Sequence, residues 1–148
     1  MHDMPGCKYS HLTKNYSIED LAAFHGHLGP YIVLGYRMGK YARETFCSDP
    51  FSMKAEVHCN GVPPQSCLID GVQLGSGCTM GKRNLDLNIS DSIKCSFTSN
   101  GKGISIVPKK ISFPPRDDKD YFNLIEALAV NMYHMDEADL FEVYPFKN

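Results

Sequence analysis

The first half of the chain contains two helical patterns of apolar residues, and each pattern has recognisable end signals. Ser17, followed by acidic residues within one turn, predicts a helix N-terminus, and Gly26 predicts the end of that helix. Pro30 predicts the first turn of a second helix. The apolar positions of this second helix are Tyr31, Leu34, Met38, Tyr41 and Ala42. Gly35 and Gly39 lie beside this face, which indicates that another backbone packs closely there.

The middle of the chain changes from a helical period to alternation. The run from Met53 to Cys59 alternates and predicts a strand, and Ser66 is the expected N-cap of a short helix ending near Leu74. Asn100-Gly101 predicts a hairpin turn. Three further runs have strand character: Leu85–Ile89, Ile93–Thr98 and Ile104–Val107.

The last third of the chain predicts one long helix and one closing strand. Asp117 or Asp118 is the expected N-cap, and Leu140–Tyr144 is the expected edge strand, ended by Pro145. The apolar stripe of the helix consists of Tyr121, Leu124, Ile125, Leu128 and Met132. Helices, then strands, then a helix predict an α+β fold with helices packed on one mixed or antiparallel sheet. We expect a single domain over residues 1–148, with its core over about 17–144.

Composition excludes several classes of protein. The 148 residues are 43% hydrophobic and 22% charged, with a net charge of -2, so no basic surface for nucleic acid is expected. The longest apolar run, Tyr31–Leu34, is far shorter than the roughly 20 residues of a membrane span. The six cysteines form no CxxC pair, and no secretory signal pattern is present. We therefore expect free thiols in a reducing, cytoplasmic setting, with a secreted protein carrying three disulfides as the alternative.

The segment Phe24–Pro30 places two imidazoles, His25 and His27, on either side of a glycine where one helix ends and the next begins. Gly26 allows the backbone to turn, so both rings can converge on one ligand, and neutral imidazole is a common metal ligand. The N-terminal amides of the second helix would favour an anion in the same space. The alternative is that one histidine caps a helix and the other is exposed to solvent.

The segment Gln65–Gly71 places Cys67 at the start of a helix and Asp70 one turn later. The helix dipole stabilises a thiolate at such a position, which suits metal ligation or nucleophilic chemistry, so we expect a lowered pKa for Cys67. Asp70 is placed to orient a ligating histidine or to accept a proton. The alternative is a small buried cysteine with an exposed aspartate.

The segment Gly75–Lys82 is rich in glycine but does not have the spacing of a nucleotide-binding P-loop. Its composition suits a nest of backbone N–H groups facing an anion, with Lys82 and Thr79 as the expected anion-binding residues. Cys78 is a reserve metal ligand or a buried residue. A tight turn without a ligand is the alternative interpretation of this loop.

Three ordered segments together resemble the family of the E subunit of formylmethanofuran dehydrogenase from anaerobic archaea and bacteria. The resemblance is carried by Phe24–Pro30, Gln65–Gln73 and Gly77–Leu85, and Leu140–Tyr144 is similar to the end of the family core. It implies an α+β core, a homodimer and a shallow site for a divalent metal, with zinc the expected ion, built from His25, His27 and Cys67. Cys78 and Asp70 are expected as a further ligand or as residues that position a ligand.

Two differences from the family pattern are visible. Gly29 stands where the first family motif usually has a cysteine, and no C-terminal zinc-finger module with paired cysteines follows the core. A role that depends on that cysteine or that module is therefore not expected. The family name refers to genes associated with the dehydrogenase and does not assign the redox step to this domain.

Two functional hypotheses follow from these residues, and neither identifies a substrate. The first is an accessory metal-binding protein of one-carbon metabolism and methanogenesis in an anaerobe, serving a larger molybdenum or tungsten dehydrogenase. The second is a metal-dependent enzyme that acts on a small anionic substrate or cofactor. Closure of the metal by four protein ligands would favour a structural role, whereas an open position would favour catalysis. No general base with a clear proton target is evident, so the first hypothesis is preferred.

Overall fold

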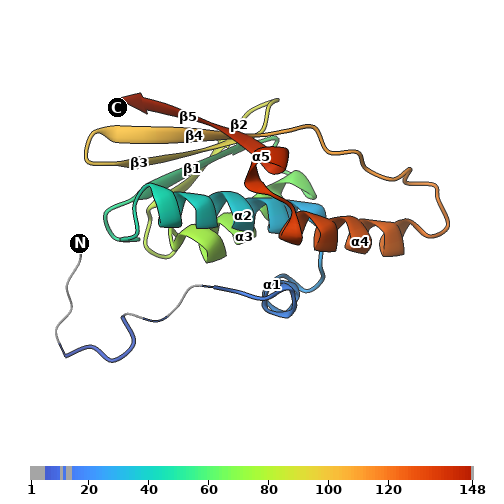
Figure 1. The fold of residues 1–148 in the computed structure, drawn as a ribbon, viewed down its shortest axis with the longest axis horizontal. Coiled ribbons are helices and arrows are strands. Elements are labelled where there is room, and N and C mark those ends of the chain that lie inside the picture. The colour runs from blue at the N-terminus through green and yellow to red at the C-terminus, as the bar shows by residue number, and fades with distance from the viewer. Residues whose placement is uncertain (1–5, 11, 13–14, 148) are drawn as a thin grey trace.

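Helices cover one face of a five-stranded sheet and leave the other face open (Figure 1). The computed structural model describes residues 6–10, 12 and 15–147. The helices are α1 (Ile18–His25), α2 (Pro30–Thr45), the 3-10 helix η1 (Gln65–Cys67), α3 (Leu68–Ser76), α4 (Tyr121–His134) and α5 (Glu137–Leu140). The strands are β1 (Lys54–Cys59), β2 (Leu85–Ile89), β3 (Lys94–Ser99), β4 (Lys102–Pro108) and β5 (Phe141–Lys147).

The strand order is β2-β1-β3-β4-β5, and the sheet is mixed. β2 pairs with β1 in parallel, whereas the other three pairings are antiparallel. The parallel pair exists because the chain crosses back through α3 between β1 and β2, which is the connection that parallel strands require. The predicted α+β fold with helices on one mixed sheet is confirmed.

The predicted ends of the first two helices are also confirmed. The Ser17 side chain accepts a hydrogen bond from the Asp20 N–H, and the Asp20 carboxylate accepts one from the Ser17 N–H, which forms a capping box. Gly26 ends α1 in the left-handed conformation with φ of 101°. Pro30 is the first residue of α2. Local side-chain chemistry therefore fixes both ends of the link that carries His25 and His27.

Two predicted helix caps are wrong. Ser66 lies inside η1, where its N–H donates to the Val62 carbonyl, so α3 begins later with Cys67 at the N-cap position. In α4 the N-cap position belongs to Asp120, which makes no capping bond. Asp118 instead accepts a hydrogen bond from the Asp120 N–H and so organises the turn before the helix.

The hairpin prediction is confirmed, whereas the predicted end of the last strand is wrong. Asn100 and Gly101 both have positive φ and join β3 to β4. Pro145 does not end β5, because it pairs with Ile104 and the strand continues to Lys147. β5 is an edge strand, and a proline without an N–H is tolerated there.

The α2–α3 contact is made of backbone on both sides. A Cβ atom at Gly35 would lie 2.3 Å from the Leu68 carbonyl oxygen, and one at Gly71 would lie 2.1 Å from the Ile32 carbonyl oxygen. Gly39 and Gly75 are equally close to the facing helix. The close approach expected at Gly35 and Gly39 is therefore confirmed, but the partner is α3 of the same chain. These glycines give no support to a dimer interface.

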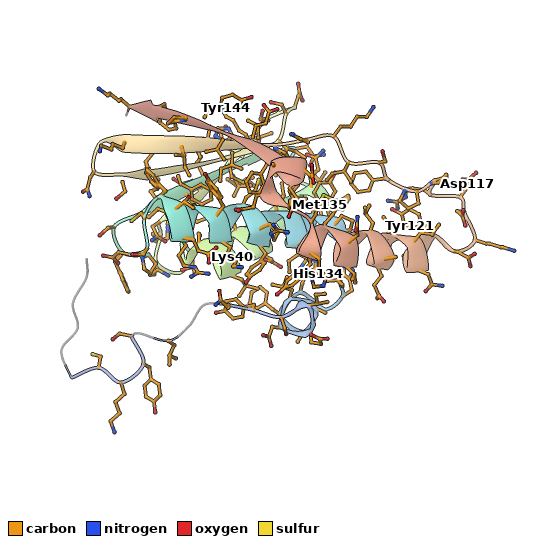
Figure 2. All side chains as sticks on the ribbon, in the orientation of Figure 1. Lys40, Asp117, Tyr121, His134, Met135 and Tyr144 are labelled. Atoms are coloured by element: carbon orange, nitrogen blue, oxygen red, sulfur yellow. The ribbon has the colours of Figure 1, made fainter. Side chains whose placement is uncertain are left out.

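Alternation along β1 separates the core from the open face of the sheet. Ala55, Val57 and Cys59 are fully buried toward the helices, whereas Glu56 and His58 point away from them. Tyr144 of β5 also stands on the open face (Figure 2). All six cysteines are free thiols. None of the helices in the described part of the chain has the length and hydrophobicity needed to cross a membrane.

We predict that Gly71→Ala lowers the free energy of unfolding by about 3 kcal/mol, because the added methyl group meets a backbone carbonyl that cannot move without separating α2 from α3. Gly81→Ala is the matched control, since its Cβ atom would have no neighbour closer than 3.9 Å. Urea unfolding of the two variants measures the difference. Equal stabilities of the two variants would show that the helix pair tolerates a wider separation.

Candidate functional site

The two histidines of the first motif lie on the link between α1 and α2. His25 is the last residue of α1, and the left-handed turn at Gly26 brings the His27 ring to a centroid distance of 5.0 Å from the His25 ring. The His25 side chain is only 12% exposed. The helix ends therefore bring the two imidazoles together, as the sequence predicts.

Asp70 of α3 holds the His25 ring. The His25 Nδ1 atom lies 2.7 Å from Asp70 Oδ2. Because a carboxylate can only accept a hydrogen bond, Nδ1 carries the proton, and in the neutral ring Nε2 keeps a lone pair for a ligand. This contact joins two segments 45 residues apart and confirms the predicted placement of Asp70 beside a histidine of the first motif.

Cys67 is the N-cap residue of α3 and is half-buried. Burial raises the pKa of its thiol, and the nearby Asp70 carboxylate raises this pKa further, while a hydrogen bond from its own backbone N–H lowers it. The expected lowering of the pKa by the helix N-terminus is therefore wrong for the metal-free protein. The reason is that Asp70 places a negative charge beside the thiol, which opposes the formation of a second negative charge.

Gly29 lies directly beside the ring of His27. A Cβ atom at Gly29 would be 3.2 Å from His27 Cε1, so any side chain at this position would press on the imidazole. The residue is also the N-cap of α2 and has an extended backbone with φ of -132°. The glycine at this family cysteine position thus removes a thiol and leaves space beside His27.

The predicted ligands gather around Asp70 without forming a closed cage. In the part of the chain that the structure describes, no three His, Cys, Asp or Glu side chains are arranged to hold a metal ion. Ligation by His25, His27 and Cys67 together would therefore require side chains to rotate. Two imidazoles and one thiol are nevertheless a donor set that suits zinc.

The glycine-rich loop lies at the other end of α3. A helix of nine residues separates Cys67 from Gly77 by about 13 Å, so Cys78 is not brought to the histidines. Cys78 is fully buried, and its Sγ is 3.4 Å from the Met53 carbonyl oxygen. As placed, Cys78 lies in the core.

Polar groups of the same loop bind one another. The Thr79 hydroxyl accepts hydrogen bonds from both the backbone N–H and the ammonium group of Lys82, each at 3.1 Å. The N–H of Thr79 donates to the Asn84 side chain, and the N–H of Met80 donates to the Gln73 side chain. These amides are engaged within the chain and do not form an open nest for an anion.

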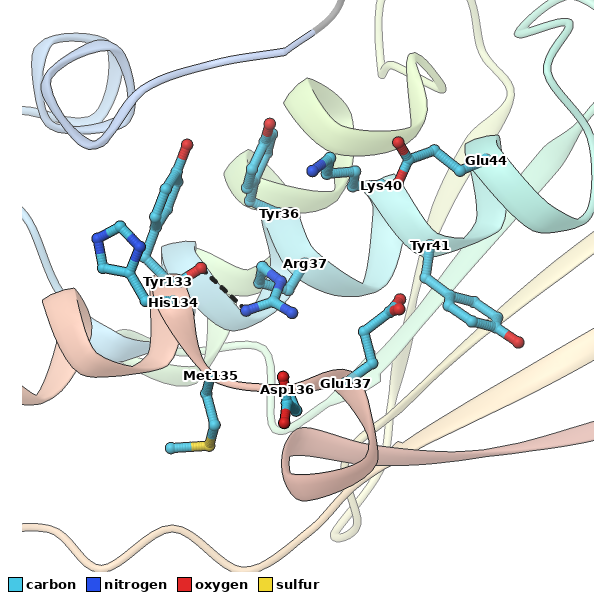
Figure 3. A pocket seen from close by; sticks show the side chains of 10 residues that line it. All are labelled: Tyr36, Arg37, Lys40, Tyr41, Glu44, Tyr133, His134, Met135, Asp136 and Glu137. Atoms are coloured by element: carbon cyan, nitrogen blue, oxygen red, sulfur yellow. Dashed lines mark hydrogen bonds between the residues drawn. The ribbon is translucent and has the colours of Figure 1, made fainter.

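The structure also shows two groups of polar residues that the sequence analysis did not single out. His58 Nε2 lies 2.7 Å from Glu56 Oε1 on the open face of the sheet, and their spacing of two residues in a strand was the available signal. A cleft of about 380 Å³ lies between α2 and the junction of α4 with α5 (Figure 3). Its residues come from segments far apart in sequence, so periodicity could not reveal it.

The fold and site describe a class of protein with a two-layer α+β core and a histidine–cysteine site near the carboxyl end of a strand. The family that matches residues 24–142 is FmdE, described as "Molybdenum formylmethanofuran dehydrogenase operon". The chain belongs to this family. The predicted resemblance is therefore confirmed over most of the chain.

Two individual proteins are similar to this chain. A probable S-adenosyl-L-methionine-binding protein of Archaeoglobus fulgidus is 39% identical over 69 residues, which are 42% of this chain and 18% of that protein. The chain thus spans less than a fifth of the length of this curated relative. An FmdE-like protein of tungsten formylmethanofuran dehydrogenase from Syntrophus aciditrophicus has a similar structure, with a TM-score of 0.54 and 21% identity. The similarity covers 88% of this chain and 70% of that one and shows a shared fold.

We predict that Asp70→Asn accelerates alkylation of Cys67 by iodoacetamide near neutral pH in metal-free protein. Loss of the carboxylate removes one cause of the raised pKa, so the thiolate fraction increases at a given pH. Peptide mass spectrometry follows Cys67 separately from the other cysteines. Asp86→Asn is the control, because Asp86 pairs with Lys54 on the sheet. An unchanged pH profile in Asp70→Asn would contradict the electrostatic link.

Proposed function

We propose that this protein is a metal-binding domain that holds one divalent ion, zinc in the first instance, with His25, His27 and Cys67. The observation that carries the proposal is the hydrogen bond between His25 and Asp70, at 2.7 Å. Histidines that bind metals commonly donate their second ring N–H to a carboxylate, which fixes the tautomer and the ring orientation. The neighbouring His27 ring and Cys67 thiol complete a donor set of the right chemical type.

An accessory role in one-carbon metabolism is the function that the family supports best. The FmdE family takes its description from a formylmethanofuran dehydrogenase operon, which is consistent with association with a larger molybdenum or tungsten dehydrogenase. Within this proposal the protein works in the reducing cytoplasm of an anaerobe that uses one-carbon metabolism, such as methanogenesis. Its ion would be delivered to, or stabilised for, the larger enzyme.

A metal-dependent enzyme acting on a small anionic substrate is the second candidate function. It is favoured by the number of protein ligands, because three ligands leave an open position where a water or substrate can bind. An anion at that position would meet the ion itself, since Lys82 is engaged with Thr79 at the far end of α3. Spectroscopy of cobalt-substituted protein with and without added formate would distinguish an open position from a closed one.

We predict that His25→Ala and Cys67→Ser lose most of the bound zinc, whereas Asp70→Asn retains it with affinity weakened about 10–100-fold. The first two changes remove donor atoms, and the third removes only the acceptor that orients His25. Competition with a zinc chelator gives the affinities, and elemental analysis of protein purified without added metal gives the natural ion.

His58→Ala is the matched control, because His58 also pairs with a carboxylate at 2.7 Å but lies on the open face of the sheet. We expect this variant to bind zinc like the unmodified protein. Stoichiometric and equally tight zinc in both His25→Ala and Cys67→Ser would place the ion elsewhere.

We further propose that the protein is a homodimer and that α4 contributes to its interface. The N-terminal half of α4 extends beyond the sheet, near the labelled Tyr121 and Asp117 (Figure 2). Its side chains include exposed Phe122 (86%), Leu124 (41%) and Val130 (36%). Exposed apolar side chains grouped on one helix are typical of a surface that another protein covers.

We predict a dimer at micromolar concentration in sedimentation equilibrium and at least a tenfold higher dissociation constant for Phe122→Asp, because the new carboxylate would be buried without a partner. Ile89→Asp is the control, since Ile89 is 67% exposed on the edge strand β2. A monomeric protein, or equal weakening by the two changes, would contradict this interface.

A further inference from the structure

A second binding site is formed by the cleft of about 380 Å³ between α2 and the α4–α5 junction (Figure 3). One wall is a single face of α2, with Arg37, Lys40 and Glu44 at spacings of three and four residues. The other wall is the short connection where α4 ends and α5 begins, with Asp136 and Glu137. The volume is within the range of pockets that bind small molecules.

The floor of the cleft is rigid. The rings of Tyr36 and Tyr133 are stacked in parallel at a centroid distance of 6.0 Å. Both hydroxyl groups bind the backbone of Tyr16: the Tyr16 N–H donates to Tyr36 at 2.9 Å, and the Tyr133 hydroxyl donates to the Tyr16 carbonyl at 2.5 Å. The aromatic pair thus connects both walls to a third segment, so the shape of the cleft does not depend on a ligand.

Arg37 is fixed to the opposite wall by one nitrogen only. Its Nη1 atom donates to the carbonyl oxygens of Met132 and Tyr133 at 2.8 and 2.9 Å. Its Nε and Nη2 donors have no partner in the described part of the chain. An immobilised guanidinium with one free edge is the arrangement that binds a carboxylate through two parallel hydrogen bonds.

Charges of opposite sign face each other across the cleft without pairing. Figure 3 shows Glu137 extending from its wall toward α2, and Arg37 extending the other way. The ion pairs found among the described residues are His25–Asp70, Lys54–Asp86 and His58–Glu56, so the charged residues of the cleft have none. A ligand with both a carboxylate and an ammonium group would complement both walls at once.

We propose that this cleft binds a free α-amino acid, with its carboxylate at Arg37 and Lys40 and its ammonium group at Glu137 and Asp136. Three acidic residues face two basic ones, because Glu44 adds a third carboxylate. The excess of negative charge favours an amino acid with a second, cationic group in its side chain. This inference uses none of the metal-binding residues and stands apart from the proposed metal function.

The test is calorimetric titration of the purified protein with L-lysine, in parallel with Nα-acetyl-L-lysine and L-lysinamide. We expect saturable binding of L-lysine with a dissociation constant of about 1 mM or lower. Each analogue lacks one of the two recognised charges, so each should bind about tenfold more weakly or worse. Amide chemical shifts of Lys40 and Glu137 locate the ligand if the heat of binding is small.

Lys40→Gln and Glu137→Gln should each weaken L-lysine binding about tenfold, because each removes a charge from one wall. Lys109→Gln and Glu126→Gln are the matched controls, since both residues are exposed and outside the cleft. Arg37 is not varied, because it also holds the end of α4. The proposal is overturned if no saturable binding occurs up to about 10 mM, if either analogue binds as tightly as L-lysine, or if the controls weaken binding equally.

Discussion

The close packing of α2 on α3 is the constraint on which the site depends. Gly35 and Gly39 meet Gly71 and Gly75 so closely that backbone touches backbone along the contact. The link with His25 and His27 leads into α2, and the turn with Cys67 leads into α3. Because both segments continue into the same locked helix pair, their relative position is set before any ion binds. The 2.7 Å contact between His25 and Asp70 closes this arrangement at one end.

Asp70 has two opposing effects on the chemistry of the site. It orients His25 and leaves Nε2 available, which prepares the ring for a metal. It also raises the pKa of Cys67, which keeps the thiol protonated until a cation arrives. A divalent ion reverses the second effect, because its charge outweighs that of the carboxylate and stabilises the thiolate. Metal binding at this site is therefore coupled to the release of a proton.

Features determined by a few neighbouring residues could be predicted from the sequence, whereas features determined by distant contacts could not. The capping box at Ser17, the stop at Gly26 and the turn at Asn100-Gly101 are local, and all three are confirmed. The position of Asp70 beside a histidine also followed from motif chemistry. The engagement of Thr79 and Lys82, the burial of Cys78 and the intramolecular role of Gly35 depend on how α3 packs. No spacing within a single segment contains that information.

The nature of the α2–α3 contact restricts how this protein can change over evolutionary time. When two side chains clash, a second substitution that shortens one of them can restore the fit, and the two changes become coupled. At Gly71 the obstacle is the Ile32 carbonyl oxygen, and at Gly75 it is the Tyr36 carbonyl oxygen. Every amino acid has that carbonyl, so no substitution at position 32 or 36 shortens it. The sequence of this helix pair is therefore closed to compensation, and divergence has to proceed through the loops and the exposed face of the sheet.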